Sequence, residues 1–85
     1  MNISKYEQRV LHVLAQGGLI RHERAENGKI QKIICFTRDG HVLNDCTYDV
    51  FQRLRKRRFI RSHGGAPYRI TWLGRKSVRA QPDNR

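Results

Sequence analysis

Residues 47–73, TYDVFQRLRKRRFIRSHGGAPYRITWL, carry the densest positive charge of this 85-residue chain and its clearest turn signals. Thr47 can cap a helix, and Val50, Phe51 and Leu54 repeat at a spacing that places them on one helical face. A Gly-Gly pair shortly followed by proline, further along, is typical of a tight turn between two strands. The segment therefore predicts a helix followed by a β-hairpin, the second half of a winged helix.

The predicted hairpin has short strands at residues 59–62 and 67–71, joined by the turn His63-Gly64-Gly65-Ala66. Glycine adopts the positive φ angles of such turns without a steric penalty, which is reason enough for the pair at this place. In a winged helix, however, the same turn would form the wing tip and contact phosphates.

A last helix is predicted at residues 72–81, with Thr71 as its N-cap and with Leu73 and Val78 facing the core. A proline then ends the helix, and nothing apolar follows that could dock on the body. Residues 82–85 are therefore expected to form a frayed tail.

The N-terminal part predicts a first helix at residues 5–16. Ser4 and Glu7 have the spacing of a capping box, and Gly17-Gly18 supplies a natural end. An apolar stripe runs along this helix through Tyr6, Val10, Leu11, Val13 and Leu14.

Two extended segments follow, at residues 19–25 and 29–37, and Asn27-Gly28 between them is a strong hairpin signal. Strict alternation in the second segment places Ile30, Ile34 and Phe36 on one face and Ile33 with Cys35 on the other. Residues 41–46 could add a third strand. The expected fold class is thus α+β, a small winged-helix-like domain built from a helix, a β-hairpin or three-stranded meander, a basic helix, a wing hairpin and a C-terminal helix.

Length and charge limit the classes of function. With 85 residues, the chain is expected to form one domain spanning positions 1–85. Its net charge is +11, and residues 51–85 hold eleven basic side chains and one acidic, whereas residues 1–50 hold seven basic and six acidic. A patch of this kind attracts polyanions or an acidic protein surface, although a solubilising surface is the alternative.

The sequence indicates a cytoplasmic protein. It has no apolar run long enough to span a membrane, and Met1-Asn2-Ile3-Ser4 lacks the features of a signal peptide. Cys35 and Cys46 are therefore expected as thiols.

Catalytic and metal-binding patterns are weak. Cys35, His41 and Cys46 fit no common zinc spacing, so we expect no metal, and we also expect no cofactor and no small-molecule substrate. His63 could act as a general base in an RNA-cleaving toxin, but it has no partner acid in the sequence. Trp72 and Tyr68 could stack on bases, but packing roles are expected for both.

Two carboxylates argue against standard reading of the major groove by the basic helix. Asp45 and Asp49 flank its N-terminus, which is the end that meets base edges in helix-turn-helix modules. The positive charge lies instead at the far end of the helix and on the wing. That distribution suits nonspecific contact with DNA or docking on an acidic protein.

The residues expected to contact a partner protein or nucleic acid are mostly cations of the C-terminal half. They are Arg53, Arg55, Lys56, Arg57, Arg58, Arg61, His63, Gly64, Gly65, Arg69, Arg75, Lys76, Arg79, Asp83, Asn84 and Arg85.

Over nearly its whole length the chain resembles the YjhX family of small bacterial toxins. The similar segments are Leu11-His12-Val13-Leu14-Ala15, Asp45-Cys46-Thr47, Val50-Phe51, Gly65 with Pro67-Tyr68-Arg69-Ile70, Val78-Arg79-Ala80-Gln81 and Asp83-Asn84-Arg85. The last segment is specific, because a frayed tail has no folding reason to carry these residue types.

The resemblance implies a non-enzymatic toxin of a toxin-antitoxin pair. Such a toxin would bind DNA topoisomerase I so that the enzyme cannot engage DNA, and an acetyltransferase-like antitoxin would neutralise it. The resemblance also implies that the tail contacts the partner. The competing interpretations from the residues are a DNA-binding winged-helix protein, such as a small transcription regulator, and the RNA-cleaving toxin.

Overall fold

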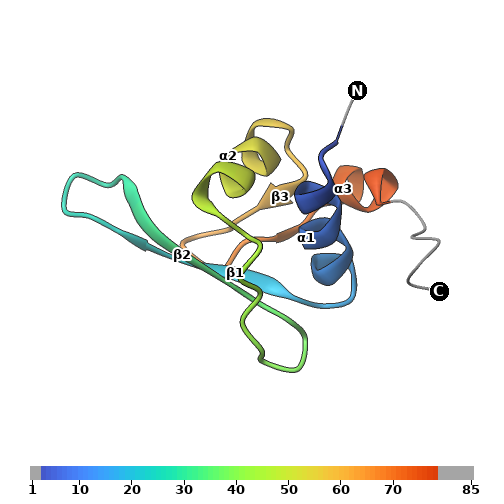
Figure 1. The fold of residues 1–85 in the computed structure, drawn as a ribbon. Helices are drawn as coiled ribbons and strands as arrows, with labels where there is room; N and C mark the ends of the chain where they lie inside the picture. Colours follow the sequence, from blue (N-terminus) through green and yellow to red (C-terminus); the bar gives the residue numbers. More distant parts are fainter. Residues whose placement is uncertain (1–2, 79–85) are drawn as a thin grey trace.

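The computed structural model describes residues 3–78. Its elements are α1 (Lys5–Ala15), β1 (Leu19–Arg24), β2 (Ile30–Phe36), α2 (Tyr48–Lys56), β3 (Ile60–Arg61), β4 (Arg69–Ile70) and α3 (Trp72–Ser77). The predicted α+β order of helix, hairpin, basic helix, hairpin and helix is confirmed (Figure 1). The predicted tail, residues 82–85, lies outside the described residues.

Local signals in the sequence fix where the helices begin. Ser4 and Glu7 form the predicted capping box at α1, and Thr47 caps α2 by accepting a 3.2 Å hydrogen bond from the Val50 amide. The last helix is shorter than predicted, because the backbone at Val78 is already extended. No helix of the described residues is long and apolar enough to cross a membrane.

Strands β1 and β2 form an antiparallel hairpin whose turn projects beyond the helices (Figure 1). The pairing shifts between Glu23–Lys32 and Arg24–Ile30, which leaves Gln31 as an extra residue in β2. The shift turns Ile30 toward the core together with Cys35, so the predicted grouping of Ile30 with Ile34 and Phe36 was wrong. Strict alternation cannot anticipate a bulge.

The predicted third strand at residues 41–46 is reduced to a single bridge between Phe36 and Val42. The strands of the second hairpin are also shorter than expected, with Ile60 opposite Ile70 and Arg61 opposite Arg69.

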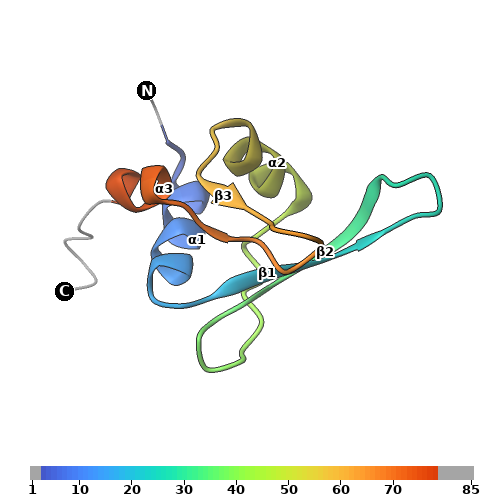
Figure 2. The ribbon, with the colours of Figure 1, turned by 180° about the vertical axis from the view of Figure 1, so that it is seen from behind.

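The two hairpins are joined through one residue pair. Ile20 and Tyr68 exchange two backbone hydrogen bonds, of 3.0 and 2.8 Å, which place β4 beside β1 (Figure 2). The Tyr68 ring then meets Phe51 of α2 edge to face, with 5.0 Å between ring centroids. These contacts hold the second hairpin against α2.

The core contains the apolar faces of α1, α2 and both hairpins. Its buried side chains are Val10, Leu11, Leu14, Ile20, Ile30, Cys35, Cys46, Val50, Phe51, Leu54, Phe59, Ile60 and Tyr68. Tyr6, which the sequence placed in the apolar stripe of α1, is exposed and does not belong to it.

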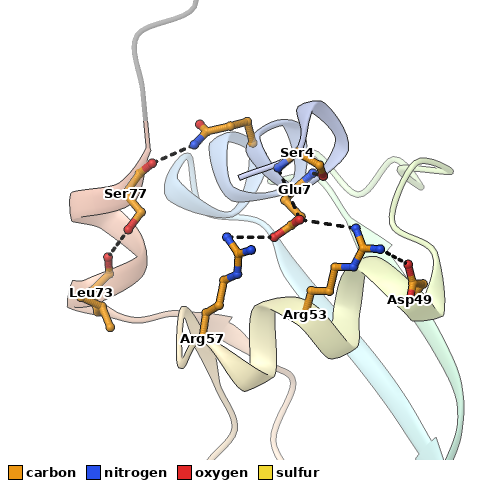
Figure 3. A network of polar contacts seen from close by, with 8 residues as sticks. Ser4, Glu7, Asp49, Arg53, Arg57, Leu73 and Ser77 are labelled. Carbon is orange, nitrogen blue, oxygen red and sulfur yellow. Dashed lines mark hydrogen bonds and ion pairs between the residues drawn. The ribbon is translucent and has the colours of Figure 1, made fainter. Parts of the chain in front are cut away.

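A buried carboxylate links the first two helices. Glu7 is only 1% exposed, and its two oxygens lie 3.7 Å from Arg53 and 3.5 Å from Arg57 of α2 (Figure 3). The same side chain accepts a 3.4 Å hydrogen bond from the Ser4 amide. The Glu7 side chain therefore both caps α1 and fixes the orientation of α2.

We predict that Glu7→Ala lowers the free energy of unfolding by about 2 kcal/mol, because it removes the cap and leaves two cations facing a buried site. A chain of this size should then melt roughly 10 °C lower, measured by circular dichroism. The matched control is Glu26→Ala in the exposed hairpin turn, which should leave the melting temperature nearly unchanged. Equal melting of the two variants would contradict the linking role of Glu7.

Candidate functional site

An open groove of about 540 Å³ lies between the end of α2, strand β3 and the start of α3. It is lined by Arg55, Arg58, Ile60, Arg61, Thr71, Trp72 and Leu73. The lining contains three guanidinium groups and no carboxylate, so the groove is strongly cationic. We call this surface the cationic groove.

Arg58 reaches the groove from an unusual backbone conformation. Its φ angle is +61°, and among the non-glycine residues of the described chain it alone has a positive φ. The Phe59 amide bonds the Leu54 carbonyl and the Arg58 amide bonds the Arg55 carbonyl, the two bonds of a Schellman motif. Glycine usually fills this position, so arginine occupies it at a cost in conformational free energy.

Thr71 ties the end of α2 to the start of α3. Its hydroxyl donates a 2.8 Å hydrogen bond to the Arg58 carbonyl and accepts a 3.0 Å bond from the Gly74 amide. Gly74 is buried, and an added methyl group there would overlap the Phe59 carbonyl. The close approach at Gly74 therefore sets the position of α3 against the groove.

This placement turns Trp72 outward. The indole is 71% exposed, and the Lys76 ammonium group lies 4.6 Å from its ring centroid. The expected packing role was wrong for Trp72 and right for Tyr68, which is buried. The inward orientation predicted for Leu73 was also wrong, because Gly74 takes the inward position. The same prediction for Val78 is confirmed, since Val78 packs against the core.

Arg55 is held in the groove by two aromatic rings. Its guanidinium carbon lies 5.5 Å from the Phe51 centroid and 5.7 Å from the Tyr68 centroid, and one nitrogen donates to Gln52. Arg55 is thus a positioned cation, in contrast to the exposed Arg58 and Arg61.

Two arginines expected at the site face another way. Arg53 and Arg57 turn to Glu7 on α1, and Arg53 also lies 3.1 Å from Asp49 (Figure 3). Neither lines the cationic groove. Lys56, on the same helix, is exposed.

The remaining predicted residues that the structure describes lie on the β3–β4 turn, on β4 and on α3, and none of them lines the groove. His63, Gly64 and Gly65 are exposed, and both glycines have the positive φ angles expected for the turn. Arg69 is exposed opposite Arg61, and Arg75 donates to the Ala15 carbonyl. The predicted contacts Arg79, Asp83, Asn84 and Arg85 lie outside the described residues.

Titratable groups near the groove add little to its charge. Burial, together with the positive charge of Arg24 and Arg55, lowers the pKa of His22, so the neutral imidazole is favoured at neutral pH. Cys35 and Cys46 are buried free thiols, and hydrogen bonding to Cys35 together with burial raises the pKa of Cys46. Residues 3–78 contain no group of three or more histidine, cysteine or acidic side chains that could hold a metal ion.

A second depression, of about 260 Å³, lies on the β1–β2 hairpin. Its lining mixes Arg21 and Lys32 with Glu23, so it lacks the uniform sign of the cationic groove. The groove is therefore the stronger candidate for binding an anionic partner.

Fold and groove together describe a small α+β protein that presents cations around an exposed aromatic ring. Comparison with known sequences then shows the family. Residues 1–85 match the YjhX toxin family, described as "Putative toxin of bacterial toxin-antitoxin pair", and the chain belongs to this family. The predicted resemblance is confirmed.

Relatives match over the full length of the chain and are named UPF0386 proteins. One from Beijerinckia indica is 66% identical and one from Brucella anthropi 64%, each with 100% of both chains covered. One from Aliivibrio fischeri is 55% identical, again over all of both chains. No solved structure shows significant similarity to this chain.

We predict that Arg58→Gly raises the free energy of unfolding by about 1 kcal/mol, because glycine adopts the left-handed conformation freely. Thermal melting should shift upward by roughly 5 °C. Arg58→Ala is the matched control, since it removes the same charge but keeps a side chain at positive φ. An equal rise in both variants would show that charge repulsion, and not backbone strain, sets the stability at this position.

Proposed function

We propose that this chain is a non-enzymatic toxin that binds DNA topoisomerase I through the cationic groove and thereby impairs replication and transcription. The observation that carries the proposal is the groove itself, with three arginines and no carboxylate in its lining. A surface of one sign steers an oppositely charged partner and excludes competitors of the same sign. Membership of a toxin family supports the toxin class, and topoisomerase I as the target is proposed from the sequence resemblance.

The proposal includes a winged-helix interpretation of the single domain. Strand β4 lies beside β1 through Ile20 and Tyr68, and in this interpretation α2 would be the recognition helix. A helix-turn-helix module has another helix just before its recognition helix, whereas here the element that precedes α2 is strand β2. At the start of α2, Asp49 pairs with Arg53 and Asp45 with Arg9, so carboxylates occupy the end that reads bases in related modules.

The partner set follows from the same proposal. An acetyltransferase-like antitoxin would neutralise the toxin in the cytoplasm, and masking the groove is the simplest way to do so. The tail residues Arg79, Asp83, Asn84 and Arg85 are proposed to contribute to partner binding. Nonspecific contact with DNA through the exposed Lys56 and Arg69 would accompany it.

A DNA-binding winged-helix regulator is the alternative, favoured by the exposed Arg61 and Arg69 next to the wing turn. The two functions differ in their dependence on salt. Duplex binding through phosphates weakens steeply as salt rises, whereas a packed protein interface persists at moderate salt. A titration with purified topoisomerase I and with duplex DNA at two salt concentrations separates them.

We predict that the double variant Arg58→Glu/Arg61→Glu binds topoisomerase I at least about tenfold more weakly, because two like charges then face the acidic partner. It should also lose growth inhibition when expressed without antitoxin. Binding is measured by surface plasmon resonance, and growth by dilution plating.

The matched control is Lys29→Glu/Lys32→Glu, which changes the net charge by the same amount on the projecting hairpin. This variant should keep both binding and toxicity. If both double variants bind topoisomerase I equally weakly, the overall charge explains the loss and the groove has no special role. If both bind as well as the wild type, the interface lies elsewhere.

A further inference from the structure

Trp72 is the most exposed of the large apolar side chains in residues 3–78. It is the single tryptophan of the chain, and 71% of its surface is exposed, next to an exposed Leu73. Single exposed apolar side chains are common, but this one lies in a groove beside three arginines, which is the combination that binds nucleic-acid bases and phosphates.

The indole is fixed on one side and accessible for stacking. Lys76 lies one helical turn after Trp72 and places its ammonium group 4.6 Å from the ring centroid. Thr71 and the buried Gly74 hold the backbone of this turn. The ring therefore has a defined place in the groove before any ligand arrives.

The charges around the ring complement a chain of phosphates. Arg55, Arg58 and Arg61 line the same groove as Trp72, and none of the seven lining residues is acidic. Arg58 keeps a left-handed backbone conformation that glycine would adopt more easily. The groove thus contains a guanidinium group at a position where the backbone alone would favour glycine.

From this juxtaposition we infer that the cationic groove binds single-stranded DNA, with a base stacked on Trp72 and the phosphates held by Arg55, Arg58 and Arg61. The inference rests on the proposed function in that both use the groove, and it names the ligand held there. Duplex bases are already stacked on one another, so a lone aromatic platform selects unpaired bases. A groove of about 540 Å³ has the size of a small-ligand site.

The lining offers nothing that would select the ribose of RNA. Thr71 is the one lining side chain that can accept a hydrogen bond, and it already bonds Arg58 and Gly74, so a ribose 2′-hydroxyl meets mainly guanidinium donors there. Cations beside a flat ring match the phosphates and bases of a nucleic-acid strand.

The first experiment uses the fluorescence of the single tryptophan. Titration of the wild-type protein with a ten-residue oligothymidylate should quench the emission of Trp72 in a saturable way, because a stacked base quenches the indole. The logarithm of the binding constant should fall with the logarithm of salt with a slope of about −2 for three phosphates. An abasic oligomer of equal length should bind more weakly and leave the emission unchanged.

The second experiment tests the ring by substitution, with anisotropy of a fluorescein-labelled oligothymidylate as readout. Trp72→Leu keeps an apolar side chain but removes the platform, and it should weaken binding by about 5- to 150-fold, the usual effect of one stacked base. Trp72→Phe should recover part of the loss. The matched control is Tyr6→Leu, which removes another exposed aromatic ring, on α1, and should leave the affinity unchanged.

Four outcomes would overturn the inference. They are equal affinity for the abasic oligomer, equal affinity for duplex DNA, equal affinity for the ribose oligomer, and displacement of the oligomer by a polyglutamate peptide at equal charge concentration. All are measured without topoisomerase I. If the wild-type protein binds topoisomerase I but not the oligomer, only this inference is defeated. If it binds the oligomer but not topoisomerase I, only the proposed target is defeated.

Discussion

The hydrogen bond from the Thr71 hydroxyl to the Arg58 carbonyl is the contact on which the cationic groove depends. It joins the left-handed turn that ends α2 to the first turn of α3, two places thirteen residues apart in the sequence. The same hydroxyl caps α3 through Gly74, so one side chain sets both walls of the groove. Because α3 starts at this point and its buried glycine faces inward, Trp72 and Leu73 turn outward.

The buried Glu7 divides the arginines of α2 into two groups. Arg53 and Arg57 face α1 and contribute to stability, whereas Arg55 packs over Phe51 and Tyr68 and lines the groove. Helical periodicity explains the division, since residues four apart share a face and residues two apart do not. Only part of the charge of this helix is therefore presented to a partner.

A toxin that acts by occupancy needs a surface and no reacting group. The proposed inhibition of topoisomerase I and the inferred single-strand site meet this need with the same side chains, because an inhibitor can hold the enzyme, its DNA or both. An antitoxin that covered the groove would block either activity. The YjhX toxin family thus gains a defined surface on which its mode of action can be tested.

The sequence by itself determined the α+β order, the caps at Ser4, Thr47 and Thr71, and the glycine turns, because these depend on interactions between near neighbours. It also indicated the cationic half of the chain and the family. Tertiary structure decided the bulge in β2, the loss of the third strand, the pairing of Glu7 with two arginines and the exposure of Trp72. The first two depend on how neighbouring strands pair, and the last two on segments distant in the chain; no local pattern encodes either.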